Sequence, residues 1–220
     1  MHRYRPRMIA AAICLAALAG FVDALAYLTL GGFFASFMSG NSTRFGIGLA
    51  TGDTASAMIA GGLLSAFLCG VMIATMLSVR FPRRRKPVVM AAVTVLLALA
   101  ALLAAITYRP YPLMLLAVAM GAENGVFNRN GEVSIGLTYM TGTLVKIGQK
   151  LAAALIGSGG ALAWVPYLAL WLGFMAGVVL GAREFAALND GALWLAAAAA
   201  GVLTLLVAAI SPATTEEPVL

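Results

Sequence analysis

The sequence predicts an all-α integral membrane protein built from two tandem repeats. Of its 220 residues, 62% are hydrophobic and only 10% are charged. A soluble domain of this size needs more charge to cover its surface, so lipid must be the solvent for most of the chain. A polar, glycine-containing motif, flanked by apolar runs, also occurs once in each half of the chain. We therefore expect a duplicated, multi-pass protein.

Each half contains three strongly apolar runs and one weaker run that is rich in glycine and hydroxyl residues. We expect transmembrane helices at residues 8–30, 55–79, 88–107, 111–127, 161–182 and 192–210, with the weaker runs at 35–51 and 133–156. The chain then divides into a basic cytoplasmic N-terminus (1–7), a first membrane repeat (8–107), a second membrane repeat (108–210) and a short disordered tail (211–220).

The repeated motif lies in the weaker runs. It consists of Ser39, Gly40, Asn41 and Ser42 in the first half and of Thr141, Gly142 and Thr143 in the second. A basic residue follows at the same distance in each copy, Arg44 in the first and Lys146 in the second. Earlier in each half, the residues from Gly20 to Asp23 match those from Gly121 to Asn124.

The distribution of basic residues favours three full spans in each half, with the weaker run broken or re-entrant. With the N-terminus inside, this arrangement places all but three of the 14 Lys and Arg residues on the cytoplasmic face, as the positive-inside rule requires. The three on the outside are Arg44, Arg109 and Arg183. Eight spans with the N-terminus outside remain a weaker alternative. An odd number of spans in each repeat predicts inverted topology, which is common in secondary transporters.

Backbone that is not helical inside a bilayer needs partners in the protein or in a water-filled cavity. Glycine and small hydroxyl or amide residues suit such a break, and a helix that starts there presents free N–H groups to an anion. The alternative is that these small residues only pack helices closely. We take as candidate solute-binding residues Ser39, Gly40, Asn41, Ser42, Thr141, Gly142, Thr143 and Asn124.

Two acidic residues, Asp23 and Glu123, lie in the first helix of each half. An ionised carboxylate inside a span costs roughly 2.5–3.5 kcal/mol on insertion scales, so it usually faces a cavity or a partner. Arg44 and Lys146 are the matched basic residues, which predicts the ion pairs Asp23–Arg44 and Glu123–Lys146. A proton-coupling carboxylate and a substrate contact are the functional alternatives.

Other classes of function lack their motifs. There is no phosphate-binding glycine loop and no zinc-binding histidine pair, and the single histidine lies in the N-terminal tail. We therefore expect no enzyme, no metal and no cofactor. The net charge of +6 is placed beside apolar runs, where it sets topology, so we expect no nucleic acid partner.

Rows of small residues follow in the third helix of each half. Gly62 and Gly70 belong to the first row, and Gly173, Gly177 and Gly181 form the second. Such rows let helix backbones approach closely in lipid. They indicate packing within the chain or, alternatively, the seam of a homodimer.

The residues from Gly20 to Ala24, together with Phe37-Met38-Ser39-Gly40-Asn41 and Tyr139-Met140-Thr141-Gly142-Thr143, resemble the YoaK-like family of bacterial membrane proteins. The resemblance covers residues 8 to 210. It implies a multi-pass protein of the bacterial inner membrane with about six spans, which agrees with the charge argument. The family is one of unknown function, so the resemblance supplies no site residue.

These observations favour a transporter-like protein that handles a small polar solute, with an anion as one candidate, at a central site formed by the two motifs. A membrane sensor or assembly partner that does not transport is an alternative, although no long loop is available for signalling. A small channel is another. The partners expected are the lipid bilayer and the solute, with a homodimer through the small-residue helix faces as an alternative.

Overall fold

The computed structural model describes residues 6–106, 111–129, 132–133 and 136–211. The predicted basic N-terminus lies outside this part except for residues 6 and 7, and the predicted tail does so except for residue 211. The α-helices of this part are α1 Pro6–Leu30, α2 Met38–Thr51, α3 Thr54–Arg80, α4 Arg85–Ile106, α5 Tyr111–Glu123, α6 Met140–Leu155, α7 Val165–Leu188 and α8 Ala192–Ile210. Short elements join them: the 3-10 helices η1 Pro82–Arg84, η2 Asn124–Phe127 and η3 Asn189–Gly191, and the antiparallel strands β1 Asn128–Arg129 and β2 Glu132–Val133.

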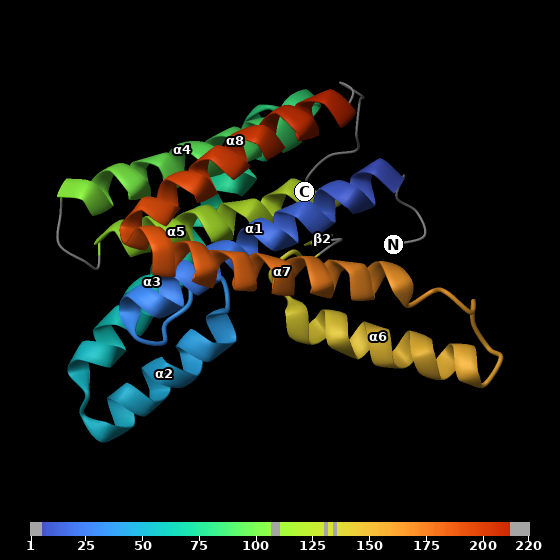
Figure 1. The fold of residues 1–220 in the computed structure, drawn as a ribbon, viewed down its shortest axis with the longest axis horizontal. Coiled ribbons are helices and arrows are strands. Elements are labelled where there is room, and N and C mark those ends of the chain that lie inside the picture. Colours follow the sequence, from blue (N-terminus) through green and yellow to red (C-terminus); the bar gives the residue numbers. More distant parts are fainter. Residues whose placement is uncertain (1–5, 107–110, 130–131, 134–135, 212–220) are drawn as a thin grey trace.

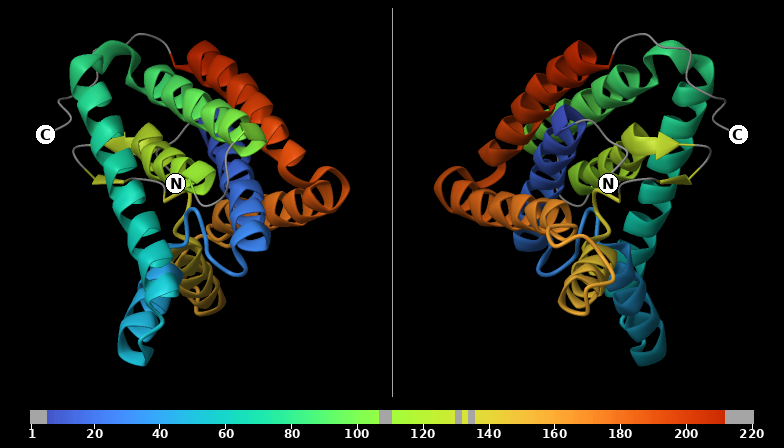
Figure 2. Two further views of the ribbon diagram at one scale, coloured as in Figure 1. Left: turned by 90° about the vertical axis from the view of Figure 1, so that its left-hand side faces the viewer. Right: turned by 90° about the vertical axis from the view of Figure 1, so that its right-hand side faces the viewer.

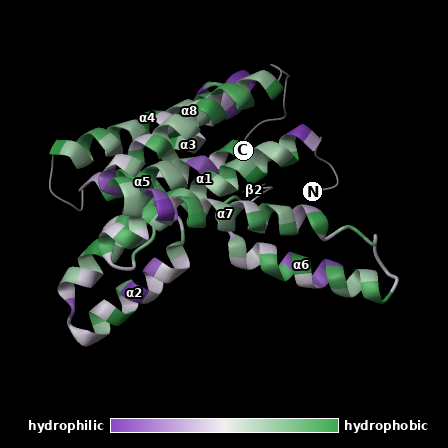
Figure 3. Ribbon diagram, viewed as in Figure 1, coloured by the Kyte–Doolittle hydropathy of each residue, from purple (hydrophilic) through white to green (hydrophobic). Residues whose placement is uncertain are grey.

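Long apolar helices dominate the structure (Figure 3). Among the described residues, four helical stretches are long and apolar enough to cross a membrane: Pro6–Leu30, Thr54–Arg80, Pro82–Ile106 and Val165–Ile210, the last of which contains both α7 and α8. Large apolar side chains such as Met58, Leu68 and Leu205 are exposed on these helices, as contact with lipid requires. The predicted all-α membrane class is therefore confirmed.

The two weaker runs form short helices. α2 has 14 residues and α6 has 16, which corresponds to about 21 Å and about 24 Å against a hydrocarbon core of roughly 30 Å. Neither helix starts at the beginning of its run. After α1, the chain first turns at Gly31 and Gly32, whose φ angles of 65° and 108° are accessible mainly to glycine.

The two halves run in opposite directions (Figure 1). α1 runs from the right of that view to the left, and α5 runs from left to right. α2 and α6 both start near the centre, where α2 leaves to the left and α6 to the right. Figure 2 shows both short helices at the same edge of the molecule. Two helix N-termini therefore meet in the middle of this edge.

Each half packs against the other through matching pairs of helices. α1 lies against α7 and α3 against α5, while α4 and α8 lie against each other. α2 and α6 pack on α3 and α7 respectively. At both crossings a glycine touches the backbone of the opposite helix: Gly20 at Phe174, Gly177 at Ala17, Gly121 at Phe67 and Gly70 at Val118. The same close crossing is thus built twice.

These crossings also account for the rows of small residues. Gly62 lies against Met114, Gly173 against Ile13 and Gly181 against Phe21. These are contacts within the chain, so the small-residue faces pack the two halves of the protein against each other. Transmembrane helices associate in lipid by close packing, and in this protein close packing joins the two halves of the chain.

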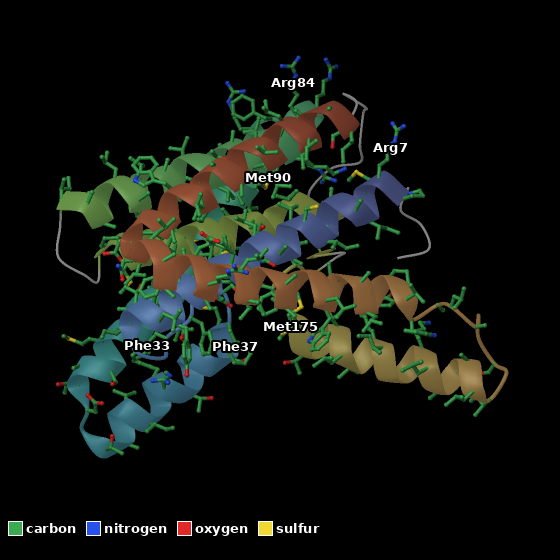
Figure 4. The ribbon with its side chains drawn as sticks, in the orientation of Figure 1. Arg7, Phe33, Phe37, Arg84, Met90 and Met175 are labelled. Carbon is green, nitrogen blue, oxygen red and sulfur yellow. The ribbon has the colours of Figure 1, made fainter. Side chains whose placement is uncertain are left out.

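The basic start of α1 and the basic residues between α3 and α4 lie on the same side of the molecule. Arg7, at the start of α1, and Arg84, between α3 and α4, lie at the same end of the helices (Figure 4). α1 and α3 thus each cross the structure once, and α2 adds no net crossing.

This arrangement predicts the result of a topology experiment. Reporters fused at the N-terminus and after Lys86 should both lie in the cytoplasm, whereas a reporter after Gly52 should lie outside. Paired alkaline phosphatase and fluorescent protein fusions would measure this. Reporters at the N-terminus and after Lys86 on opposite faces would contradict the arrangement.

The glycine crossings give a prediction about stability. Gly177→Ala places a methyl group against the Ala17 carbonyl, so overpacking should cost roughly 1–3 kcal/mol. Gly148→Ala is the control, because no atom lies within 4 Å of its added methyl group. Thermal unfolding in detergent compares the two variants, and an unchanged Tm for Gly177→Ala would show that the crossing is loose.

Candidate functional site

A cavity of about 290 Å³ lies where the starts of α2 and α6 meet. We call it the polar cavity. Its lining comes from both copies of the motif and from α3: Ser36, Phe37, Met38, Ser39, Phe67, Thr138, Tyr139, Met140, Thr141 and Gly142. Of the predicted solute-binding residues, Ser39, Thr141 and Gly142 line this cavity. No Lys or Arg is part of the lining.

Both helices start at the cavity without a side-chain cap. Phe37 precedes α2 and Tyr139 precedes α6, and neither side chain accepts a hydrogen bond from the helix start. The first N–H groups of a helix have no partner inside the helix and carry partial positive charge. The cavity thus receives the positive ends of two helices that run in opposite directions.

Two hydrogen-bonded pairs hold the segments that lead into these helices. In the first half, the Ser36 amide donates to Asp23 Oδ1 at 2.6 Å and the Ser36 hydroxyl donates to Oδ2 at 2.7 Å. In the second half, the Thr138 hydroxyl donates to Asn124 Oδ1 at 3.2 Å. All four side chains are buried. Asp23 and Asn124 therefore occupy equivalent places, as their sequence match predicts.

Sequence reasoning missed Ser36 and Thr138, although both line the polar cavity. They precede the conspicuous glycine motif and lie at matching places in the two copies. Extending the comparison of the two halves toward the N-terminus from Ser39 and Thr141 would have found them.

Other predicted solute-binding residues do not line the cavity. Asn41 is fully buried, and its amide accepts from the Phe34 N–H at 3.1 Å and donates to the Phe34 carbonyl at 2.7 Å. Thr143, its counterpart, donates to the Tyr139 carbonyl, and Ser42 donates to the Met38 carbonyl. Their hydrogen bonds fix the backbone around each helix start.

Gly40 and Asn124 serve the same purpose. The Phe37 ring lies where a side chain on Gly40 would extend, so glycine lets the ring approach the helix. Asn124 holds Thr138 and also donates to the Met120 carbonyl at 2.9 Å. Gly40 and Asn124 thus position the lining residues Phe37 and Thr138 without lining the cavity themselves.

The predicted ion pairs are not formed in the described structure. Asp23 binds Ser36 instead, and the Arg44 guanidinium lies over the Phe33 ring at 4.7 Å from its centroid. Lys146 lies on α6, with its Nζ 5.7 Å from the centroid of the Tyr167 ring. Each basic side chain is thus held by an aromatic ring of its own half, away from the acid.

Glu123 is the most unusual polar group of the site. It is fully buried, and within the described part of the chain neither of its carboxyl oxygens has a hydrogen-bond partner. Asp23 is close enough to act on it electrostatically. A buried charge without a partner is very costly. An ionised Glu123 would therefore destabilise the fold rather than stabilise it.

A second, larger cavity of about 480 Å³ adjoins the first. Its walls are mostly apolar and include Tyr27, Phe34 and Met175, with Asp23 as the acidic residue. Phe37, Thr138 and Met140 line both cavities. Phe37 and Met175, which are both labelled near the centre of Figure 4, belong to this lining.

Comparison with known proteins places the chain in a family. The family model described as a protein of unknown function, DUF1275, matches residues 11–206. The chain belongs to the DUF1275 family. This confirms the resemblance that the repeated motif predicts, and it extends over both halves of the site.

DUF1275 relatives are named as bacterial transmembrane proteins. The UPF0700 transmembrane protein RA0705 of Rhizobium meliloti is 35% identical over 187 residues, which cover 85% of this chain and 80% of that protein. The UPF0700 transmembrane protein YoaK of Bacillus subtilis is 31% identical over 155 residues, which cover 65% of this chain and 66% of that protein. No solved structure matches. A bacterial membrane protein is thus supported from both sequence and structure.

The geometry around Asn41 gives this DUF1275 protein a testable feature. Asn41→Ala leaves the Phe34 N–H and carbonyl without their partner, and losing both bonds should cost about 1–3 kcal/mol. The control is Ser42→Ala, which removes a single exposed bond within α2. Thermal unfolding in detergent measures both, and equal Tm values for the two variants would contradict a structural role for Asn41.

Proposed function

We propose that this protein transports a small polar solute, with small anions as the preferred class, and binds it in the polar cavity. The observation that carries the proposal is the meeting of two helix N-termini at one cavity between the halves. Helix starts offer fixed N–H donors and the positive end of a dipole to an anion. Ser39 and Thr141 add a hydroxyl donor from each side.

The small volume of the cavity supports a solute with few heavy atoms. Since no Lys or Arg contributes to the lining, the attraction comes from dipoles and hydroxyl groups. Such a site binds an anion without the strong attraction of a full positive charge, and moderate affinity suits a carrier that must also release its solute.

We also propose that the two halves are inverted-topology repeats. The opposite directions of α1 and α5 support this, as do the matched glycine crossings of α1 with α7 and of α3 with α5. In transporters with such repeats, the site lies near the midplane on discontinuous helices, and one unit rocks against the other. The short helices α2 and α6 would be the discontinuous elements here.

Proton coupling through Asp23 or Glu123 is the second part of the proposal. Both carboxyl groups are buried beside the site, and neither is neutralised by the basic residue that the sequence offered. Ionisable residues inside a membrane commonly belong to ion or proton pathways.

The test is flux into proteoliposomes that contain the purified protein. Nitrate, acetate and phosphate serve as anionic probes, and urea and glycerol as neutral ones. We expect saturable uptake of at least one anion. The double variant Ser39→Ala/Thr141→Val should weaken it at least about a hundredfold, since each of the two lost hydrogen bonds to a charged group contributes ~1.5–3 kcal/mol.

A matched control separates the site from general damage. Thr75→Val removes a hydroxyl that bonds only to Val71 in its own helix, far along α3 from the motif, and should leave uptake unchanged. Uptake that does not saturate would favour a channel. Movement of none of the five probes, or equal uptake by the double variant, would contradict the proposed site.

A further inference from the structure

Ser36 connects a buried acid to the polar cavity. It is one of the residues that line the cavity, and its hydroxyl lies 2.7 Å from Asp23 Oδ2. The other carboxyl oxygen, Oδ1, is already engaged by the Ser36 N–H at 2.6 Å. Oδ2 is therefore the oxygen of Asp23 at which a proton would lie between the acid and the hydroxyl.

The direction of this hydrogen bond depends on whether Asp23 carries that proton. A hydroxyl has one hydrogen to donate, whereas an ionised carboxylate only accepts. When Asp23 is ionised, Ser36 must donate to it, and only oxygen lone pairs face the cavity. When Asp23 is protonated at Oδ2, the acid donates to Ser36, and the serine hydrogen is free to point into the cavity.

We propose that Asp23 and Ser36 form a proton-controlled switch, through which the polar cavity binds an anion together with one proton. The inference rests on the proposed function and deepens it by naming the coupling step. With Asp23 ionised, Ser36 presents lone pairs that repel an anion. With Asp23 protonated, Ser36 presents a donor that adds to those of the two helix starts.

The second half has the same construction without the titratable group. There Thr138 donates to the Asn124 amide, which has no proton to gain in the physiological range. The Thr138 bond therefore keeps one direction. Only the first half can switch, so one proton is expected for each anion.

The groups around Asp23 fit this assignment. On α5, Glu123 is the acidic residue and lies at the end of the helix. On α7, Arg183 and Glu184 lie toward the end of the helix and Tyr167 lies in its first turn, and α8 carries no titratable residue. Arg44 of α2 is held over Phe33. Two buried carboxyl groups near each other favour a state in which at least one is protonated, so the pair has a proton available for the switch.

The decisive variant is Asp23→Asn. Because Oδ1 accepts the Ser36 N–H, the amide NH₂ of the new residue takes the place of Oδ2 and donates to the Ser36 hydroxyl. Asparagine thus imitates protonated Asp23, and the natural Asn124 shows that an amide is tolerated at the equivalent place.

The experiment measures binding of nitrate, acetate and phosphate to the purified protein by calorimetry over a range of pH. For the wild type, linkage of one proton predicts affinity that rises by up to about tenfold for each pH unit of acidification. Asp23→Asn should bind with the wild type's low-pH affinity at every pH. Ser36→Ala should bind weakly at every pH.

Two control variants should keep the pH dependence of anion binding. Thr138→Val should bind the anion more weakly than the wild type, and Asp53→Asn removes an exposed carboxyl group that caps α3. Anion binding without pH dependence in the wild type would overturn the switch and leave the transport proposal standing. Weak binding by Asp23→Asn, or a retained pH dependence in Ser36→Ala, would also overturn it. Absence of binding by all three anions would overturn the anion site itself.

Discussion

A backbone segment that is not helical within a bilayer must have all its polar groups satisfied by the protein or by a cavity, and the centre of this structure depends on that constraint. The chain turns back after α1 and starts α2 near the centre of the structure, and it starts α6 there as well (Figure 1). Side chains supply the partners that a regular helix would supply itself. Asn41 takes both polar groups of Phe34, and Asp23 takes both donors of Ser36. Neither helix start has a side-chain cap, and the polar cavity lies at both of them.

The rigid frame that holds this centre is the pair of glycine crossings. Gly177 lets α7 approach α1, and Gly70 lets α3 approach α5, with contact between backbones rather than side chains. Such contact fixes the two first helices, and with them Asp23 and Asn124, relative to the rest of the protein. The loops that carry Ser36 and Thr138 are tied to these two residues. Close packing of helices therefore sets the dimensions of the cavity from a distance.

The all-α membrane class and the place of the candidate site could be predicted from the sequence because they follow from composition and from the repeated motif. The sparse charge requires lipid, and the duplicated motif at Ser39 and Thr141 identifies the two helix starts. Side-chain partners could not be predicted in the same way. Asp23 and Arg44 carry opposite charges at matched places, but helix direction turns Arg44 back onto Phe33. Asn41 was predicted to bind the solute because it is polar, but its amide is hydrogen-bonded to the backbone of Phe34. Ser36 was overlooked because the comparison of the two halves stopped at the glycine motif, and its hydrogen bond to Asp23 is visible only in the structure.

The two halves share their packing but differ in their ionisable chemistry, and this difference has a consequence for mechanism. The first half has Asp23 where the second has Asn124, and the second has Glu123 where the first has Val22. If both halves titrated, an anion would meet two switches and require two protons. If neither did, solute binding would not depend on pH. On the proposed mechanism, one titratable anchor and one neutral anchor beside the same cavity give one proton for each anion. Duplication would then supply the symmetric frame, and the loss of symmetry at these positions would supply the coupling.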